Sequence, residues 1–488
     1  MAAGPDAQRA CTMYINDTKL VFYASELRLR GDNPVVQPHE GDGNVLCWNG
    51  EIFGGLDVSP HENDGLKLFV ALGSLSTVEQ VVEFFGTLEG PYAFVYYQHR
   101  TRSLIFGRDP LGRRSLLVHK PTAQQPYFIL SSTSTGAHSG CRFEELSTTG
   151  LFLINIDRLD ENNVSQPALR ESRFMATIRQ TLTHFQATLP PVNTDEPAED
   201  LHQIDALASD LPPYLENAAA EFQRHLEDSV HRRIFDIPEP STKGEARVGV
   251  LFSGGIDCSV LALLADKYTP SDEPIDLLNV AFENPRKLGA DVDRNAKRKT
   301  KPKPATAPAS PPQKPAYMVP DRVTGLEEVE ELRRLCPRRV WNFVEVNIPF
   351  EETQVARSTI GATMYPCRTV MDLSLAQALY FAAKGEGFIR EHPGADPRPY
   401  TSRARVLLNG LGSDELLGGY GRHRTAFKAG GWRALTKELQ LELDRLPTRN
   451  LGRDDRIISA HGKEARHPFL SLDVVRFLAA LPVHAKTD

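Results

Sequence analysis

Short apolar stretches bounded by turn residues dominate the first third of the chain. Residues 94–97, 104–106 and 115–118 are examples, and each has the apolar, β-branched or aromatic character of a strand. The pattern predicts a β-rich block from about residue 12 to 155.

Helical spacing appears between residues 214 and 235, where apolar side chains recur every three or four positions. An uninterrupted apolar run at 248–252 then suits a strand buried on both faces of a parallel sheet. Strands and helices alternate beyond it, with strands expected at 277–282, 344–347 and 406–408 and helices at 326–336 and 373–384. This alternation predicts a doubly wound α/β domain with a parallel sheet.

Two polar, proline-bearing stretches divide the chain. Residues 159–213 are predicted to link an N-terminal domain, 1–158, to a C-terminal domain, 214–488. Residues 286–316 are rich in lysine, arginine and proline, and they cannot bury enough apolar surface to offset the entropy of ordering. They are predicted to be a disordered insertion, and a nuclear-localisation signal or a nucleic-acid contact is the alternative.

Composition narrows the class of protein. The 488 residues are 41% hydrophobic and 24% charged, as in ordinary globular proteins of two or three domains. A net charge of -7 gives no reason to expect nucleic acid as a partner, and no apolar run suits a membrane span or a signal peptide. Six scattered cysteines argue against a zinc site and a disulfide framework. We expect a cytoplasmic protein with small-molecule ligands, and a homodimer stays open.

A Ser-Gly-Gly-Ile-Asp segment at residues 253–257 follows the buried strand and opens a helix. Such a turn leaves backbone N–H groups free, and the helix dipole favours an anion. Gly254 and Gly255 allow the backbone to approach phosphate oxygens, and Ser253 adds a hydroxyl donor. Asp257 is expected to order the loop or help hold Mg²⁺. The segment lacks the Gly-Lys-Ser/Thr of a Walker A loop, and the simpler interpretation is a tight turn with an N-cap serine.

The loop resembles that of the ATP-pyrophosphatases, which adenylate a substrate and release pyrophosphate. Residues 408–420 (LNGLGSDELLGGY) and 462–470 (GKEARHPFL) are similar to two further motifs of the asparagine synthetases. By this resemblance ATP is expected at Leu251, Ser253, Gly254, Gly255, Asp257, Ser259, Val280, Asn409 and Gly410. Mg²⁺ is expected at Asp257, Asp414 and Glu415, with helix capping as the alternative for Glu415. Asp321 is expected either to cap a helix or to border the substrate pocket.

The Asn-Gly-Glu element at residues 49–51 resembles that of class II glutamine amidotransferases, which implies a β-rich, Ntn-hydrolase-like domain, here truncated. In that family the Asn side chain and the Gly N–H stabilise the oxyanion, as Asn49 and Gly50 would here. Glutamine is expected at Asn49, Gly50, Glu51 and Asp64. A structural turn of the family resembles residues 108–116. The alternative for Asn49 and Gly50 is a hairpin turn.

The chain also departs from the family pattern. It begins Met1-Ala2-Ala3-Gly4, whereas the family nucleophile is a cysteine directly after the initiator methionine, and Cys11 is internal. No catalytic residue is therefore assigned, and we expect no glutamine hydrolysis, because of either an omitted first exon or a lost activity. Asp372 is the only acidic residue where the family has a Glu and an Asp. Lys463 and Lys486 are not convincing substitutes for its phosphate-binding lysine.

The whole pattern resembles most the asparagine synthetase domain-containing proteins, a eukaryotic subgroup. Three functions follow. The first is glutamine-dependent asparagine biosynthesis, in which ATP adenylates aspartate to β-aspartyl-AMP and ammonia displaces AMP. The second is a related ATP-dependent ligase that uses free ammonia or another acid acceptor. The third is an ATP-binding interaction or regulatory protein without catalysis.

Overall fold

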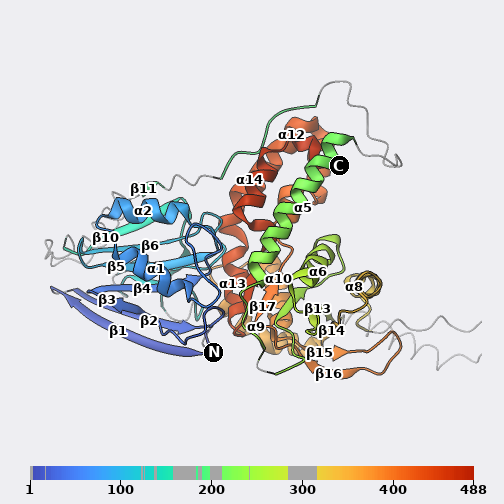
Figure 1. The fold of residues 1–488 in the computed structure, drawn as a ribbon, viewed down its shortest axis with the longest axis horizontal. Helices are drawn as coiled ribbons and strands as arrows, with labels where there is room; N and C mark the ends of the chain where they lie inside the picture. The colour runs from blue at the N-terminus through green and yellow to red at the C-terminus, as the bar shows by residue number, and fades with distance from the viewer. Residues whose placement is uncertain are drawn as a thin grey trace, which may run out of the picture.

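The computed structural model describes residues 4–16, 18–122, 125, 127–136, 140–157, 183–184, 189–197, 212–240, 242–283 and 316–487. They form an N-terminal β-rich domain and a C-terminal α/β domain, which lie side by side (Figure 1). The predicted insertion, 286–316, lies outside the described residues except for its last position, and so does most of the predicted linker. None of the described helices is long and apolar enough to cross a membrane.

Antiparallel strands build the N-terminal domain. Its main sheet has the order β11-β10-β6-β5-β4-β3, and the smaller sheets are a two-stranded ribbon, β1-β2, and a three-stranded sheet, β8-β7-β9. The strands are β1 (Ala7–Ile15), β2 (Thr18–Glu26), β3 (His39–Gly41), β4 (Asn44–Gly50), β5 (Tyr92–Gln98), β6 (Ser103–Arg108), β7 (Leu117–His119), β8 (Ile129–Ser131), β9 (Phe143–Glu145), β10 (Gly150–Asn155) and β11 (Thr183–His184).

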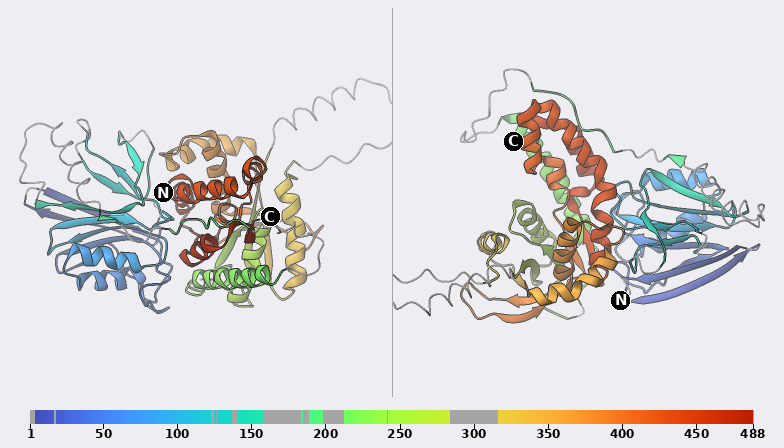
Figure 2. Two further views of the ribbon diagram at one scale, coloured as in Figure 1. Left: turned by 90° about the horizontal axis from the view of Figure 1, so that it is seen from above. Right: turned by 180° about the vertical axis from the view of Figure 1, so that it is seen from behind.

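Successive side chains of the main sheet point to opposite faces, and each face has its own core. One face packs against helices α1 (Asp64–Gly73) and α2 (Val78–Thr87), through side chains such as Leu72 and Phe85. The other packs against the β1-β2 ribbon and the three-stranded sheet, through Phe22 and Val118. The two helices lie on the same side of the sheet in Figure 2. The sequence pattern predicted a β-rich block here without them.

A seven-stranded sheet of order β16-β15-β14-β13-β12-β17-β18 forms the centre of the C-terminal domain. Its strands are β12 (Val248–Leu251), β13 (Ile275–Phe282), β14 (Trp341–Ile348), β15 (Glu386–Ile389), β16 (Arg398–Thr401), β17 (Val406–Leu408) and β18 (Glu464–Arg466). The strands from β14 to β18 in this order are parallel, and β15 and β16 add an antiparallel edge. The doubly wound parallel sheet predicted from the sequence is therefore confirmed.

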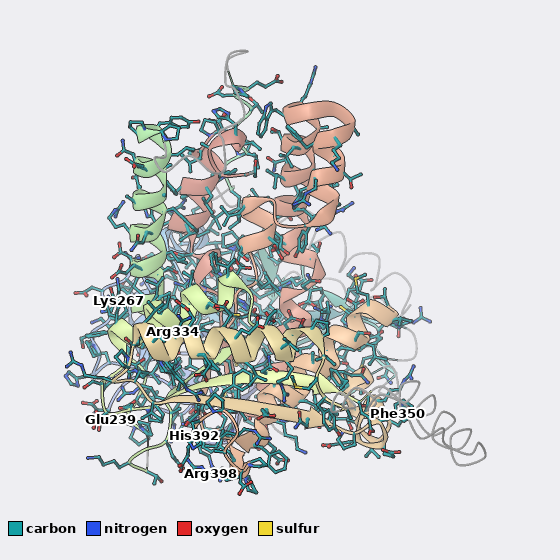
Figure 3. All side chains as sticks on the ribbon, turned by 90° about the vertical axis from the view of Figure 1, so that its right-hand side faces the viewer. Glu239, Lys267, Arg334, Phe350, His392 and Arg398 are labelled. Carbon is teal, nitrogen blue, oxygen red and sulfur yellow. The ribbon has the colours of Figure 1, made fainter. Side chains whose placement is uncertain are left out.

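Helices lie on both faces of this sheet and beside it. They are α5 (Pro213–Ile234), α6 (Ile256–Tyr268), α8 (Pro320–Leu335), α9 (Phe350–Thr363), α10 (Val370–Lys384), α11 (Ser413–Leu417), α12 (Gly421–Arg449), α13 (Leu451–Ser459) and α14 (Leu472–Ala480), with short 3₁₀ turns at Pro468–Leu470 and Val483–Ala485. Helices α5, α6 and α8 share a core with one face, and α10 and α13 share a core with the other. Helices α11, α12 and α14 form a separate helical core beside the sheet. Figure 3 shows α8, which carries Arg334, lying along the sheet.

Strand β12 occupies the position where the chain reverses its direction across the sheet. The connection through α6 leads from β12 to β13 on one side, whereas β17 lies on the other side of β12. In open α/β sheets, ligands bind outside the carboxyl ends of the strands at such a switch point. Residues 253–257 and 409–420 directly follow β12 and β17, so both motifs lie at this position.

Candidate functional site

The loop between β12 and α6 is open on one side and tightly packed on the other. Ser253 and Gly255 are exposed, and Ile256 is 77% exposed. Gly254 has φ +86°, and a Cβ added there would lie 2.3 Å from the backbone nitrogen of Gly325 in α8. Only glycine combines that left-handed φ with so close an approach. Gly255, not a serine, occupies the N-cap of α6, so the N-cap serine interpretation is wrong.

Helix α8 is fastened to the back of this loop by buried polar contacts. Asn279 in β13 donates through Nδ2 to the carbonyl oxygen of Phe252, 2.8 Å away, and to that of Asp321, 2.9 Å away. Arg322 donates through Nε to Asn279 Oδ1 at 2.6 Å, and Thr324 Oγ1 donates to the Ser253 carbonyl at 3.1 Å. Sequence reasoning missed Asn279 and Arg322, because polar residues inside a strand or a first helical turn carry no distinctive spacing.

The predicted cap at Asp321 is wrong. The N-cap of α8 is Val319. Asp321 lies exposed in the first turn, where the negative charge of its carboxylate interacts favourably with the positive end of the helix dipole. Its carbonyl oxygen, rather than its side chain, takes part in the contacts behind the loop.

The motif after β17 meets the loop after β12. A Cβ on Gly410 would lie 3.2 Å from the Cβ of Asp257, so the two backbones approach closely. Asn409 accepts through Oδ1 from the Leu411 backbone N–H at 3.0 Å, which closes a turn. Ser259 likewise orders its own loop, since its hydroxyl donates to the Gly255 carbonyl at 3.1 Å.

The two acidic residues of the motif have different surroundings. Glu415 is buried, and its carboxylate accepts from the Gly412 N–H at 3.1 Å and from the Tyr420 hydroxyl at 2.6 Å. The capping alternative for Glu415 is thus confirmed. Asp414 is half-buried, and its pKa is raised by burial and by the negative charges of Asp257 and Glu415. The influence of Asp257 on Asp414 agrees with the close approach of the two motifs.

The two acidic residues that remain candidates for holding a cation here are Asp257 and Asp414. Mg²⁺ usually takes one or two carboxylates together with substrate phosphates and water, and Asp257 and Asp414 provide such a pair. Among the residues that the structure describes, no group of three or more His, Cys, Asp or Glu side chains is arranged to hold a metal ion alone. The half-buried Leu251 and Val280 share one apolar cluster beside the loop, as an adenine-contacting pair would.

The amidotransferase-like residues lie at the end of β4. Asn49 and Gly50 pair with Ala93 and Tyr92 of β5, within a continuous ladder. The hairpin-turn alternative for this dipeptide is therefore wrong. A Cβ on Gly50 would lie 2.6 Å from the Pro91 carbonyl oxygen, which explains the glycine.

Glu51 and Asp64 come together with a third charged residue, Arg30, which sequence reasoning missed. All three are buried, and Arg30 Nε lies 3.7 Å from Glu51 Oε2. Asp64 accepts from the backbone N–H groups of Ile52 and Gly65. Burial and the charge of Asp64 raise the pKa of Glu51 to about 8. No motif in the sequence marks Arg30, which lies outside the Asn-Gly-Glu element.

Two buried atoms of this group have no hydrogen-bond partner among the described residues. They are Glu51 Oε2 and Arg30 Nε, which face each other as an ion pair at 3.7 Å, too far apart for a hydrogen bond. Unpaired buried polar atoms are costly, so a ligand or water is expected to contact them.

Charged side chains also hold the two domains together. Arg114 donates to Asp455 Oδ1 at 3.0 Å, and Arg456 donates to Glu145 Oε2 and Ser115 Oγ, both at 2.7 Å. The turn at residues 108–116 supplies Arg114 and Ser115 to this interface, in agreement with its expected structural role, and β9 supplies Glu145. Arg466 in β18 lies 3.3 Å from Glu51 Oε1 and so connects the interface to the acidic pair.

The remaining candidate residues are protonated or are engaged in contacts within the protein. Burial, followed by the influence of neighbouring groups, raises the pKa of Cys11 to about 11 and that of Cys47 to about 12, so neither thiol ionises near neutral pH. The ammonium groups of Lys463 and Lys486 donate to the backbone carbonyls of Ser402 and Leu478, respectively. Asp372 caps α10 and pairs with Arg453 at 2.7 Å.

Family models match both domains. An asparagine synthase model matches residues 221–301 and 427–488, and a glutamine amidotransferase domain model matches residues 23–136. The first model ends within the insertion and resumes in α12, and the second includes Arg30, Glu51 and Asp64.

Similar proteins extend over almost the whole chain. The asparagine synthetase domain-containing protein 1 of Bos taurus is 37% identical, covering 99% of this chain and 85% of its own. Its Homo sapiens counterpart is 35% identical over 99% and 84%, respectively. An asparagine synthetase domain-containing protein of Saccharomyces cerevisiae is 29% identical over 100% and 81%. A solved glutamine phosphoribosylpyrophosphate amidotransferase from B. subtilis, with 12% identity over 52% of this chain and 49% of its own, has a TM-score of 0.22, too low to bear on the fold.

Proposed function

The chain belongs to the asparagine synthetase domain-containing proteins, and from this premise we propose that it is an ATP-dependent ligase that amidates aspartate. The observation that carries the proposal is the meeting of two motifs at one sheet edge. The loop after β12 and the segment after β17 touch where Gly410 approaches Asp257. An exposed glycine-rich loop at a helix N-terminus, with Asp257 in the loop and Asp414 in the adjoining motif, suits the triphosphate of ATP with Mg²⁺.

In the proposed reaction, the loop at residues 253–257 holds the phosphates while the β-carboxylate of aspartate attacks the α-phosphorus. The new P–O bond gives β-aspartyl-AMP, and pyrophosphate leaves. Donors of the loop and the N-terminus of α6 stabilise the negative charge of the leaving group. Mg²⁺ at Asp257 and Asp414 would supply further charge neutralisation when bound. Ammonia then displaces AMP and asparagine forms.

The N-terminal domain is proposed to bind glutamine. Arg30 would pair with the α-carboxylate of glutamine, and Glu51 and Asp64 with its ammonium group. The buried grouping of Arg30, Glu51 and Asp64 supports this assignment, because it places one guanidinium group and two carboxylates together. Asn49 and Gly50 are the candidate oxyanion donors. No nucleophile for glutamine cleavage is assigned, since the pKa values of Cys11 and Cys47 keep both thiols protonated.

Pyrophosphate release tests the proposal. The full chain is incubated with ATP and Mg²⁺, with or without aspartate, and with either ammonia or glutamine. We expect release that depends on aspartate and is supported by ammonia, and Asp257→Asn should abolish it. Release with ammonia but not with glutamine would identify a ligase without glutaminase activity. A chain that binds ATP but shows no aspartate-dependent release would overturn amidation of aspartate.

One observation favours a second candidate, a ligase for another acid acceptor. Asp372, in the first turn of α10, is the only acidic residue of residues 364–372, and its carboxylate accepts from the Thr369 hydroxyl and from Arg453 Nη1 at 2.7 Å. It is therefore not free to bind the ammonium group of an amino-acid acceptor. A panel of carboxylic acids in the same pyrophosphate assay separates this candidate from the first.

A further inference from the structure

Arg466 touches both candidate sites. Strand β18 pairs with β17 so that Arg466 lies opposite Leu408, the residue before Asn409. The backbone carbonyl of Arg466 accepts from the Asn409 N–H at 2.9 Å, at the wall of the candidate nucleotide pocket. Its guanidinium group points the other way, into the interface, where Nη2 lies 3.3 Å from Glu51 Oε1. One residue thus links the end of β17 to the candidate glutamine site.

The guanidinium group is held firmly on its other sides. Arg466 Nε donates to Glu464 Oε1 at 2.6 Å, and Nη1 donates to the Arg233 carbonyl at 2.7 Å. The ring of Phe53, two residues after Glu51, lies 5.6 Å from the guanidinium carbon. By contrast, Nη2 has no hydrogen-bond partner among the described residues, although it is buried. The contact with Glu51 is therefore the loosest of the four and the one that a small displacement changes most.

A displacement of Arg466 would change the ion-pair energy between Arg466 and Glu51. The pair is buried, and ion-pair energies vary steeply with distance where water is excluded. Arg30, Asp64 and Glu464 also act on this carboxylate, and the positive charge of Arg466 favours its ionised form. The ionised form is the one that binds an ammonium group. A ligand that moves Asn409 would consequently alter the affinity of the site around Glu51.

We propose that Arg466 is a positioning residue that couples occupancy of the nucleotide pocket to glutamine binding at Glu51. The proposal rests on the proposed function, because it takes ATP and glutamine as the two ligands. Coupling between sites is reciprocal, so glutamine also changes the affinity for the nucleotide by the same factor. Arg466 acts through Glu51 and Asn409, and it needs no contact with either ligand.

Calorimetry on the full chain tests the coupling. Glutamine is titrated with and without saturating α,β-methylene-ATP and Mg²⁺, which does not release pyrophosphate. In the unaltered chain we expect the two Kd values to differ at least about fivefold, the lower end of measured allosteric couplings. In Arg466→Lys the ratio is expected to fall to within about twofold of one, since an ammonium group cannot keep three fork-like contacts at once.

Matched variants separate coupling from stability. Arg339→Lys changes another buried arginine of the same domain, one that contacts Asp266 and the carbonyls of Pro270 and Glu273. This variant should keep the full ratio between the two Kd values for glutamine. Phe53→Leu removes the ring beside Arg466 without changing any charge and should lower the ratio even where Arg466→Lys does not fold.

The outcomes distinguish this proposal from the proposed function. If both ligands bind the unaltered chain with a ratio of one, coupling is overturned and the proposed function stands. If the ratio persists in Arg466→Lys or, where that variant does not fold, in Phe53→Leu, Arg466 is not the coupling residue. If the unaltered chain binds neither ligand, both proposals fall.

Discussion

Replacing Gly254 with alanine tests the closest contact of the candidate nucleotide site. The new Cβ would lie 2.3 Å from the nitrogen of Gly325 and 2.5 Å from the carbonyl carbon of Thr324. Both are backbone atoms of α8, so no flexible side chain can move aside. Either the loop or the helix must shift.

The cost has two parts. A non-glycine residue at φ +86° loses about 1–2 kcal/mol relative to glycine. Overpacking against a fixed backbone adds about 1–3 kcal/mol. Gly254→Ala should therefore lower the free energy of unfolding by about 2–5 kcal/mol. Nucleotide affinity should fall as well, because the loop no longer holds its shape.

Gly244→Ala is the matched control. Gly244 has φ +89°, but nothing lies within 4 Å of an added Cβ, so only the backbone part of the cost applies. Urea unfolding of the two variants, followed by ATP titration of each, isolates the contact with α8. The reasoning is refuted if Gly254→Ala loses no more unfolding free energy than Gly244→Ala and binds ATP as the unaltered chain does.

Three further variants probe the cation, the glutamine site and the interface. Asp414→Asn removes one of the two candidate carboxylates, so it should weaken the binding of Mg²⁺-ATP at least about tenfold in calorimetry and leave the binding of metal-free ATP unaffected. An equal loss of affinity for Mg²⁺-ATP and for metal-free ATP would contradict the metal role. Glutamine affinity should rise with pH between about 6.5 and 8.5, because the pKa of Glu51 is raised to about 8 and only the ionised carboxylate pairs with an ammonium group. A flat profile, or one unchanged in Glu51→Gln, would exclude that role. Arg456→Met should cost about 1.5–3 kcal/mol in urea unfolding, the range for hydrogen bonds to a charged group, because Glu145 keeps a second cationic partner in Arg108 at 3.3 Å; exposed Arg357→Met should cost under about 0.5 kcal/mol.

The sequence predicted the C-terminal sheet well because its strands are buried on both faces. Such strands are continuous apolar runs, as in β12, and their alternation with helices leaves little topological choice. The positions of the two phosphate-site motifs followed from the same argument. Helices α1 and α2 were missed because each has only ten residues and both lie between strands β4 and β5 in a region rich in turn residues.

Long-range polar contacts were beyond the reach of the sequence pattern. Asn279 and Arg322 are 43 positions apart, and Glu51 and Arg466 come from different domains. Spacing along one element predicts neither pair. The isolated residues also gave misleading local signals: Asp321 was expected to cap α8, and Asn49 with Gly50 was open to a hairpin turn.

The interface explains why the two domains should be treated as one functional unit. Arg113, Arg114 and Arg456 are buried, and each donates across the interface, to the Leu470 carbonyl, Asp455 and Glu145 respectively. A buried charge is tolerated only while its partner is present, so separating the domains would leave several charges unpaired in each. Such an interface resists rigid-body opening. Communication between the candidate sites is then expected to pass through small shifts of residues that already bridge it, and Arg466 is placed to make one.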